Sequence, residues 1–193
     1  MRQDSISCPV FVNKINQVKP FIRFGLITGF LVGMWNLSCF TIVGWVNRVL
    51  SLDIPATRIR AYSGLFGLVI LAIGIFLGIN EKKRREKHLT YKAAIKTGIS
   101  IALISAVVVS FFSFIYCTVI NPGYTEFMVK QTQQALVAAN RNPEEISRAL
   151  NSAKSFYSPA SQVIQALIVQ SVFGTIASLI TGLFLRTKIS TSI

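Results

Sequence analysis

The side chains that could perform acid–base or nucleophilic chemistry are few in this 193-residue chain. His88 is the single histidine, and it lies in the charged run 81–88 (EKKRREKH), where a solvated loop residue is the simplest interpretation. Asp4 and Asp53 lie outside every long apolar segment. They therefore cannot supply the two buried carboxylates of an intramembrane aspartyl protease, and a rhomboid-type serine protease would need its histidine within the membrane. We expect no enzyme active site.

The cysteines do not form a ligand pattern either. Cys8, Cys39 and Cys117 are odd in number and far apart, whereas a zinc site needs clustered Cys and His side chains. The chain also lacks a G-x-x-x-x-G-K-[ST] phosphate loop and a dinucleotide-binding fingerprint. We expect no metal and no cofactor.

Long uncharged segments make up most of the chain. The mean hydropathy is +0.55 and only 14% of residues are charged, against about 25% in a typical soluble domain. Four segments are long enough, as helices, to cross the roughly 30 Å hydrocarbon core of a bilayer. We predict an all-α, integral membrane four-helix bundle, a single membrane domain over 1–193, with spans at 24–47, 61–80, 97–120 and 159–185.

Basic residues are concentrated on one side of these predicted spans. The segments 1–23, 81–96 and 186–193 together carry 13 of the 20 Lys and Arg residues. Positively charged segments of this kind stay in the cytoplasm, so we expect both termini to be cytoplasmic. The net charge of +13 then follows from membrane topology, and we expect no nucleic-acid partner.

The cytoplasmic run after the second span admits a second interpretation. A dense juxtamembrane basic cluster can bind anionic lipid, at about 1 kcal/mol per basic residue near the surface. The simpler alternative is that the cluster only sets the topology. The candidate lipid-binding residues are Lys82, Lys83, Arg84, Arg85 and Lys87.

Small residues recur at four-residue spacing in each span, which places them on one face of a helix. Small residues let helix backbones approach closely in a membrane, where no hydrophobic force draws helices together. Packing within the bundle is the first interpretation, and a homo-oligomer face is the alternative. The candidate packing or oligomer residues are Gly25, Gly29, Gly33, Gly98, Gly174 and Gly182.

The polar side chains of Asn36, Gln165 and Gln170 lie within the apolar segments. Each would need a hydrogen-bond partner if it were buried in the membrane. We interpret them first as hydrogen bonds between helices and second as a solute site. In that second interpretation Asn36 and Gln170 line a polar path.

The loop 121–158 between the third and fourth spans is predicted to be an external helical hairpin. A break is expected at Asn140-Arg141, after which Asn142 can cap a second helix with Pro143 at its first position. That helix has one apolar stripe, which we expect the protein itself to cover, with the hairpin either on the bilayer surface or over the mouth of the bundle: Ile146, Leu150, Ala153 and Tyr157. A shorter stripe in 1–23 suggests an interfacial helix ending near Pro20: Phe11, Ile15, Val18 and Ile22.

Several stretches resemble a family of bacterial four-span membrane proteins known as domain of unknown function 4199. The similar stretches are FGLITG at 24–29, YKAAIKTG at 91–98, INPGY at 120–124 and ITGLFLRTK at 180–188. The resemblance covers nearly the whole chain. It implies a bacterial inner membrane and a periplasmic hairpin, and it brings no known activity.

The expected function is that of a non-enzymatic accessory, scaffold or assembly protein acting through lipid, itself or an unidentified membrane partner. A small oligomeric channel or transporter for a neutral solute is the alternative. Anionic-lipid binding is a third possibility.

Overall fold

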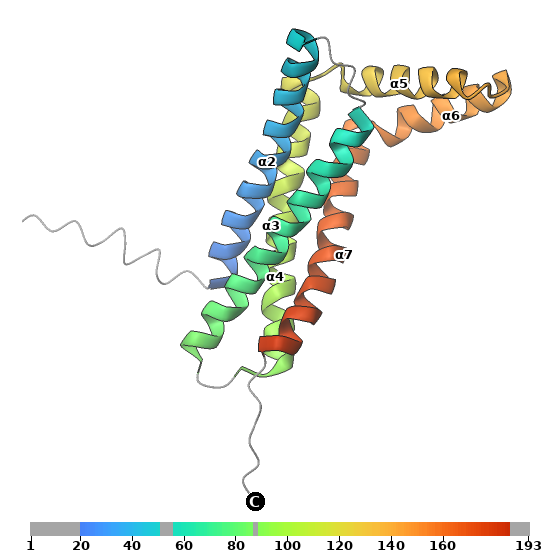
Figure 1. Ribbon diagram of the computed structural model, residues 1–193. Coiled ribbons are helices and arrows are strands. Elements are labelled where there is room, and N and C mark those ends of the chain that lie inside the picture. The colour runs from blue at the N-terminus through green and yellow to red at the C-terminus, as the bar shows by residue number, and fades with distance from the viewer. Residues whose placement is uncertain (1–19, 51–55, 87–88, 186–193) are drawn as a thin grey trace, which may run out of the picture.

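The computed structural model describes residues 20–50, 56–86 and 89–185, and it describes no side chain at 40, 43–50 or 56–61. These residues are almost entirely helical and include no strand, so the predicted all-α class is confirmed. Four long helices run side by side as a bundle, and a pair of shorter helices extends from one end of it (Figure 1).

The long helices are α2 (Pro20–Leu50), α3 (Ala56–Arg85), α4 (Tyr91–Ile115) and α7 (Pro159–Leu185). Each contains a stretch long and apolar enough to cross a membrane: Pro20–Cys39, Tyr62–Arg85, Tyr91–Ile120 and Pro159–Leu185. The predicted spans 24–47 and 61–80 fall within α2 and α3, which extend past them at both ends because polar residues there continue the helix. The predicted span 159–185 coincides with α7, and 97–120 begins within α4 and ends at Ile120, beyond the last residue of α4. Proline at the first residue of α2 and α7 suits a helix start, where its missing N–H costs nothing.

The ends of α4 follow from particular residues. Thr90 precedes it, and its hydroxyl oxygen accepts a hydrogen bond from the backbone N–H of Ala93 at 3.3 Å. At the far end α4 passes directly into a π-helical turn, η1 (Tyr116–Ile120), which closes when the N–H of Asn121 donates to the carbonyl of Tyr116 at 2.8 Å. Pro122 follows the last residue of the predicted span and ends the helix, but the wider π turn was not predicted.

The helical hairpin consists of α5 (Tyr124–Ala138) and α6 (Pro143–Phe156). The break lies where we predicted it, because Asn140 adopts a left-handed backbone with φ 51°. The side chain of Asn142 accepts a hydrogen bond from the N–H of Glu145 at 2.8 Å, which confirms the predicted cap. The stripe on α6 is half-buried or buried, so the hairpin itself covers most of it.

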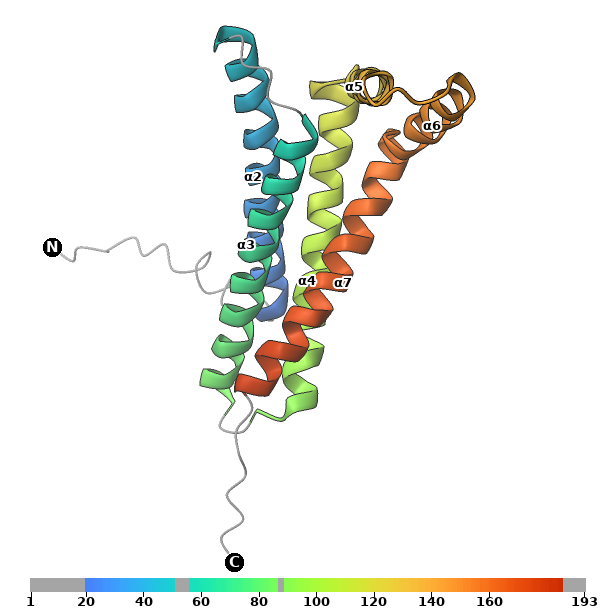
Figure 2. The same cartoon turned by 45° about the vertical axis from the view of Figure 1, so that its right-hand side comes forward.

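The hairpin extends sideways from one end of the bundle and does not fold over its mouth, as Figure 1 shows in side view and Figure 2 with α5 seen almost end-on. Hydrogen bonds fix the corner where the hairpin meets the bundle. The amides of Gln162 and Gln165 both donate to the carbonyl of Phe156, at 3.0 and 2.9 Å, and Thr125 donates to the carbonyl of Tyr157 at 2.9 Å. The corner is therefore a defined joint between α7 and the hairpin.

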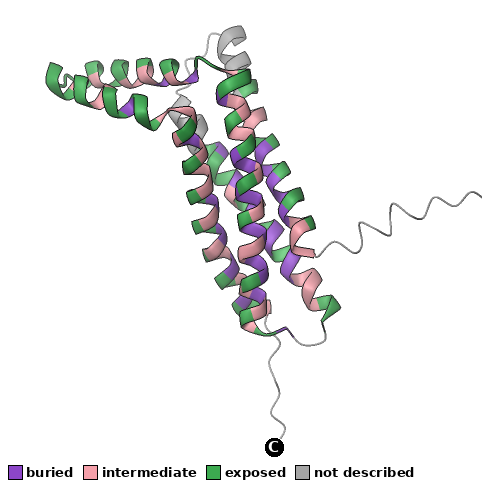
Figure 3. Cartoon of the chain, turned by 180° about the vertical axis from the view of Figure 1, so that it is seen from behind, coloured by how far each residue is buried: buried purple, intermediate pink, exposed green. Residues whose placement is uncertain are grey.

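We divide the bundle into two halves. The hairpin half (33–50, 56–70, 107–120 and 159–172) carries α5 and α6, and the basic-loop half (20–32, 71–86, 89–106 and 173–185) carries the charged run. Buried residues run along the inner faces of the bundle helices, and exposed residues cover its outside and most of the hairpin (Figure 3). The predicted interfacial helix before Pro20 and the tail 186–193 lie outside the described residues.

Candidate functional site: a polar cavity in the hairpin half

Glycine contacts within the chain hold the basic-loop half together and reach as far as Gly33, the first residue of the hairpin half on α2. Gly25, Gly29 and Gly33 of α2 face α4, where an added Cβ at Gly29 would lie 2.8 Å from the Cβ of Val108. Gly98 of α4 faces Ser178 of α7. Because these faces are already covered by neighbouring helices, they are not available to a second copy in this conformation. An oligomer through another surface stays a prediction.

The same packing continues along α7. A Cβ at Gly174 would overlap the Cβ of Ala102 on α4, and a Cβ at Gly182 would lie 3.2 Å from the ring of Tyr91. All six predicted glycines thus lie at contacts with α4 or, for Gly98, on α4 itself. Helix α4 is therefore the helix against which α2 and α7 pack through these glycines.

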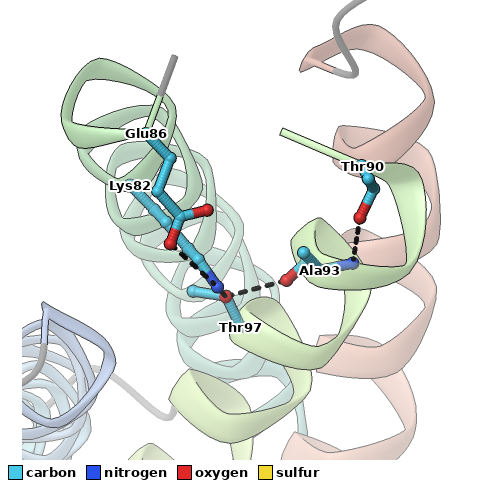
Figure 4. A network of polar contacts seen from close by, with 5 residues as sticks. All are labelled: Lys82, Glu86, Thr90, Ala93 and Thr97. Carbon is cyan, nitrogen blue, oxygen red and sulfur yellow. Dashed lines mark hydrogen bonds and ion pairs between the residues drawn. The ribbon is translucent and has the colours of Figure 1, made fainter. Parts of the chain in front are cut away.

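Two of the basic side chains in the charged run at the end of α3 form ion pairs with glutamates of the same run. Lys82 donates to the hydroxyl of Thr97 on α4 at 3.0 Å and lies 3.8 Å from Glu86, and Thr97 in turn donates to the carbonyl of Ala93 (Figure 4). Arg85 pairs with Glu81 at 3.0 Å. Lys82 therefore links α3 to α4.

The other basic residues of this run are differently placed. Lys83 and Arg84 have no ion pair among the residues that the structure describes, so they are the members of the cluster best placed to meet lipid phosphate. Lys87 and His88 lie outside the described residues. Anionic-lipid binding stays a prediction. Of the four described candidate side chains, Lys83 and Arg84 are the two that we expect to take part in it.

A cavity of about 250 Å³ lies between α2, α3, α4 and α7 in the hairpin half. Its polar lining includes the two residues of the predicted polar path, Asn36 and Gln170, together with Ser113 and Gln165. No charged side chain is among the described residues that line it. The structure thus brings together residues that lie on separate helices and up to 134 positions apart in the chain, from Asn36 to Gln170.

Gln170 is the most unusual residue of this lining. Its side chain is only 6% exposed, and its carbonyl oxygen has no hydrogen-bond partner among the described residues. A buried amide without a partner costs about 1–3 kcal/mol of stability. Ser105 also has a buried, unpartnered oxygen, but it lies under Gly29 and does not line the cavity.

The other predicted polar residues use their hydrogen bonds locally. The amide of Asn36 donates to the carbonyl of Val32 in its own helix at 2.9 Å, and Gln165 bonds Ser161 and Phe156. Our expectation of hydrogen bonds between the membrane helices is therefore wrong for Asn36 and Gln170. The amide of Asn36 is instead used within its own helix, and the carbonyl oxygen of Gln170 has no partner among the described residues.

Aromatic side chains lie where the cavity meets the hairpin. Tyr116 and Tyr124 both line the cavity, with ring centres 5.7 Å apart, and Tyr124 contacts Tyr157 at 6.4 Å. The amide of Asn121 donates to the Tyr116 hydroxyl at 3.1 Å. The π turn carries Tyr116 and Cys117 into the lining, and such turns are frequent at functional sites.

Toward the basic-loop half the cavity ends on close-packed apolar residues. Val32, Leu71 and Ala106, one helical turn further along their helices, are at most 1% exposed. On α7 the next turn is Gly174 against Ala102. The cavity is therefore a blind pocket in this chain and does not continue as a pore.

Sequence reasoning missed Ser113, Tyr116 and Gln162. Gln162 could have been found, because Gln162, Ala166 and Gln170 follow one another at four-residue spacing on a single face of α7. Tyr116 could not, because its position depends on the π turn.

Among the described residues, no three His, Cys, Asp or Glu side chains lie close enough together to hold a metal ion. No curated protein and no solved structure matches the chain. A family model described as "Protein of unknown function (DUF4199)" matches residues 23–187. The match spans most of the 193 residues, and it agrees with the four membrane-length helices and with the resemblance seen in the sequence. This multi-pass membrane protein belongs to the DUF4199 family.

Proposed function

We propose that this chain is a non-enzymatic accessory protein of the bacterial inner membrane that binds a neutral polar ligand in the cavity of its hairpin half. The observation that carries the proposal is Gln170, a residue of the cavity lining whose buried carbonyl oxygen has no partner in the described part of the chain and would reach a ligand after a small rotation of the side chain. A ligand with an N–H or O–H group would satisfy it and recover the cost of burying it.

The lining supports a neutral ligand. Amides, hydroxyls and apolar side chains border the cavity, and its described lining holds no charged side chain to balance an ion. Transfer of an unpaired ion into such surroundings is far more costly than transfer of a neutral group that finds a hydrogen bond.

The closed floor favours binding over conduction through one chain. Val32 and Leu71 would have to move apart before a solute could continue toward the basic-loop half. Proteoliposomes of the wild-type protein should therefore show no flux of neutral solutes. Flux that disappears in Gln170→Leu would establish the channel alternative instead.

The proposed orientation follows from charge. The basic segments at 81–96 and at both termini would lie in the cytoplasm, and the hairpin would lie along the outer surface. Its sideways direction from the bundle suits that place (Figure 1). The hairpin is also the surface that we propose for an unidentified membrane partner.

The test is native mass spectrometry of the protein extracted directly into lipid nanodiscs. The wild-type protein should retain an uncharged small molecule, and Gln170→Leu should retain about tenfold less of it, since one lost hydrogen bond to a buried group costs about 1–3 kcal/mol. Gln134→Leu makes the same chemical change on the exposed surface of α5 and should retain the wild-type amount. Equal retention by all three proteins would refute the proposal.

A further inference from the structure

The cavity opens toward the lipid between α3 and α7. Among its lining residues, Gly64 of α3 is exposed and an added Cβ there would meet nothing within 4 Å, while Val169 of α7 is 44% exposed. Both lie within the membrane-length stretches of their helices. Their sequence neighbours Leu65 and Ile168 are exposed apolar side chains, 61% and 58% accessible, of the kind that faces hydrocarbon.

The opening exists because α3 and α7 diverge. In the basic-loop half Ile75 of α3 is fully buried and lies 3.6 Å from the position of a Cβ on Gly174 of α7. Gly64, about three turns further toward the hairpin and on the same side of α3, has no such neighbour. The helices therefore touch at one level and leave a gap at the next.

The size and chemistry of the cavity limit what can enter through this gap. About 250 Å³ is below the roughly 300–1,000 Å³ of sites that enclose a whole drug-sized ligand, so the cavity suits one polar group of a larger molecule. The Gln170 carbonyl oxygen needs a donor. The hydroxyl of Ser113 already donates to the carbonyl of Val109 at 3.1 Å and can only accept a further bond.

We infer that the ligand is an uncharged amphiphile of the surrounding bilayer, whose hydroxyl- or amide-bearing head group enters between α3 and α7 and donates a hydrogen bond to Gln170. Its acyl chain stays in the lipid beside Leu65 and Ile168. This inference rests on the proposed function and adds the class of ligand and its route of entry. The same head-group chemistry occurs in water-soluble amides and alcohols, and the test separates the two sources.

The experiment uses the full chain in phosphatidylcholine nanodiscs that contain a diacylglycerol with a diazirine on one acyl chain. After irradiation, cross-linked peptides are quantified by mass spectrometry. The wild-type protein should cross-link in the hairpin halves of α3 and α7. Gly64→Trp and Val169→Trp, which would fill the opening from either side, and Gln170→Leu should each reduce this cross-linking at least fivefold.

The controls are Leu183→Trp, at an exposed position of α7 in the basic-loop half, and Gln134→Leu, and both should match the wild type. Each tryptophan variant is scored only where it elutes as the wild-type species in size-exclusion chromatography, and Gly64→Trp replaces a residue with open space around it. A second arm measures binding of N-methylacetamide, a neutral soluble amide, by saturation-transfer NMR on the wild-type protein and Gln170→Leu.

Two outcomes would overturn the inference in different ways. If N-methylacetamide binds in a Gln170-dependent manner and diacylglycerol cross-linking ignores Gly64→Trp, Val169→Trp and Gln170→Leu, the ligand comes from water and the proposed function stands. If neither probe depends on Gln170, the inference and the proposed function both fail.

Discussion

The two halves of the bundle are built from the same four helices but differ in how closely these helices pack. In the basic-loop half, glycines bring backbones together, and the side chains of Ile75, Ile101 and Ala102 are at most 1% exposed. In the hairpin half the helices separate around a cavity whose Gln170 has a polar atom without a partner. The close packing of the basic-loop half (the closed half) stabilises the bundle. In the hairpin half (the open half) the unpartnered oxygen of Gln170 lowers the stability but leaves a polar group for a ligand.

This difference teaches where the chain can tolerate change. A larger side chain in the closed half must push two backbones apart, whereas in the open half it enters empty space. Conversely, removing the unpartnered polar group of Gln170 should cost nothing in the fold of the open half. The predictions that follow test this contrast, starting with the largest expected effect.

Gly174→Leu should destabilise the protein by about 3 kcal/mol or more, at the upper end of the cost of overpacking. The reason is that a Cβ there overlaps Ala102, whose own Cβ and backbone cannot rotate away. Gly64→Leu is the matched change in the open half and should leave the apparent melting temperature nearly unchanged. The comparison fails if the two variants melt alike in the same nanodiscs.

Gln170→Leu should raise the stability of the ligand-free protein by about 1–3 kcal/mol, because it removes a buried carbonyl oxygen that has no partner among the described residues. Thermal unfolding of delipidated protein, followed by circular dichroism, measures this effect. A lower melting temperature than the wild type would mean that Gln170 is held by the fold and is not kept for a ligand.

Asn142→Ala should loosen α6 by about 1 kcal/mol, because it removes the hydrogen bond to the N–H of Glu145. Hydrogen–deuterium exchange should speed up in α6 and stay unchanged in α4 and α7. Asn151→Ala, at an exposed position within the same helix, is the control and should not speed exchange. Faster exchange throughout the bundle would show that the hairpin and bundle unfold together.

Arg84→Gln should weaken the retention of anionic lipid by at most about 1 kcal/mol, because Arg84 has no carboxylate partner in the described part of the chain. Native mass spectrometry in phosphatidylglycerol nanodiscs can count the retained lipids. Arg148→Gln at the hairpin serves as the control and should have no effect. Equal retention by Arg84→Gln and the wild type would leave the cluster with topology as its only role.

Much of the fold could be predicted from the sequence because it depends on local features. Uncharged runs of membrane length, Asn142 before Pro143 and the stop at Pro122 each act over a few residues. Four-residue glycine spacing likewise showed which faces pack, although not which helix each face meets.

The cavity was only partly predictable. Asn36 and Gln170 were recognisable as polar residues in apolar segments, but their sharing one cavity depends on how α3 and α7 diverge between Ile75 and Gly64. The π turn that places Tyr116 in the lining depends on the hydrogen bond from Asn121, which no spacing rule indicates. Tertiary geometry, and not residue type, decides these features.

The most direct test of the account is an experimentally determined structure of the wild-type protein in a native-lipid nanodisc. We predict density within hydrogen-bond distance of the Gln170 side chain, continuing outward between α3 and α7, with closed packing at Ile75 and Gly174. A collapsed hairpin half in which Gln170 bonds another residue of the chain would contradict the account.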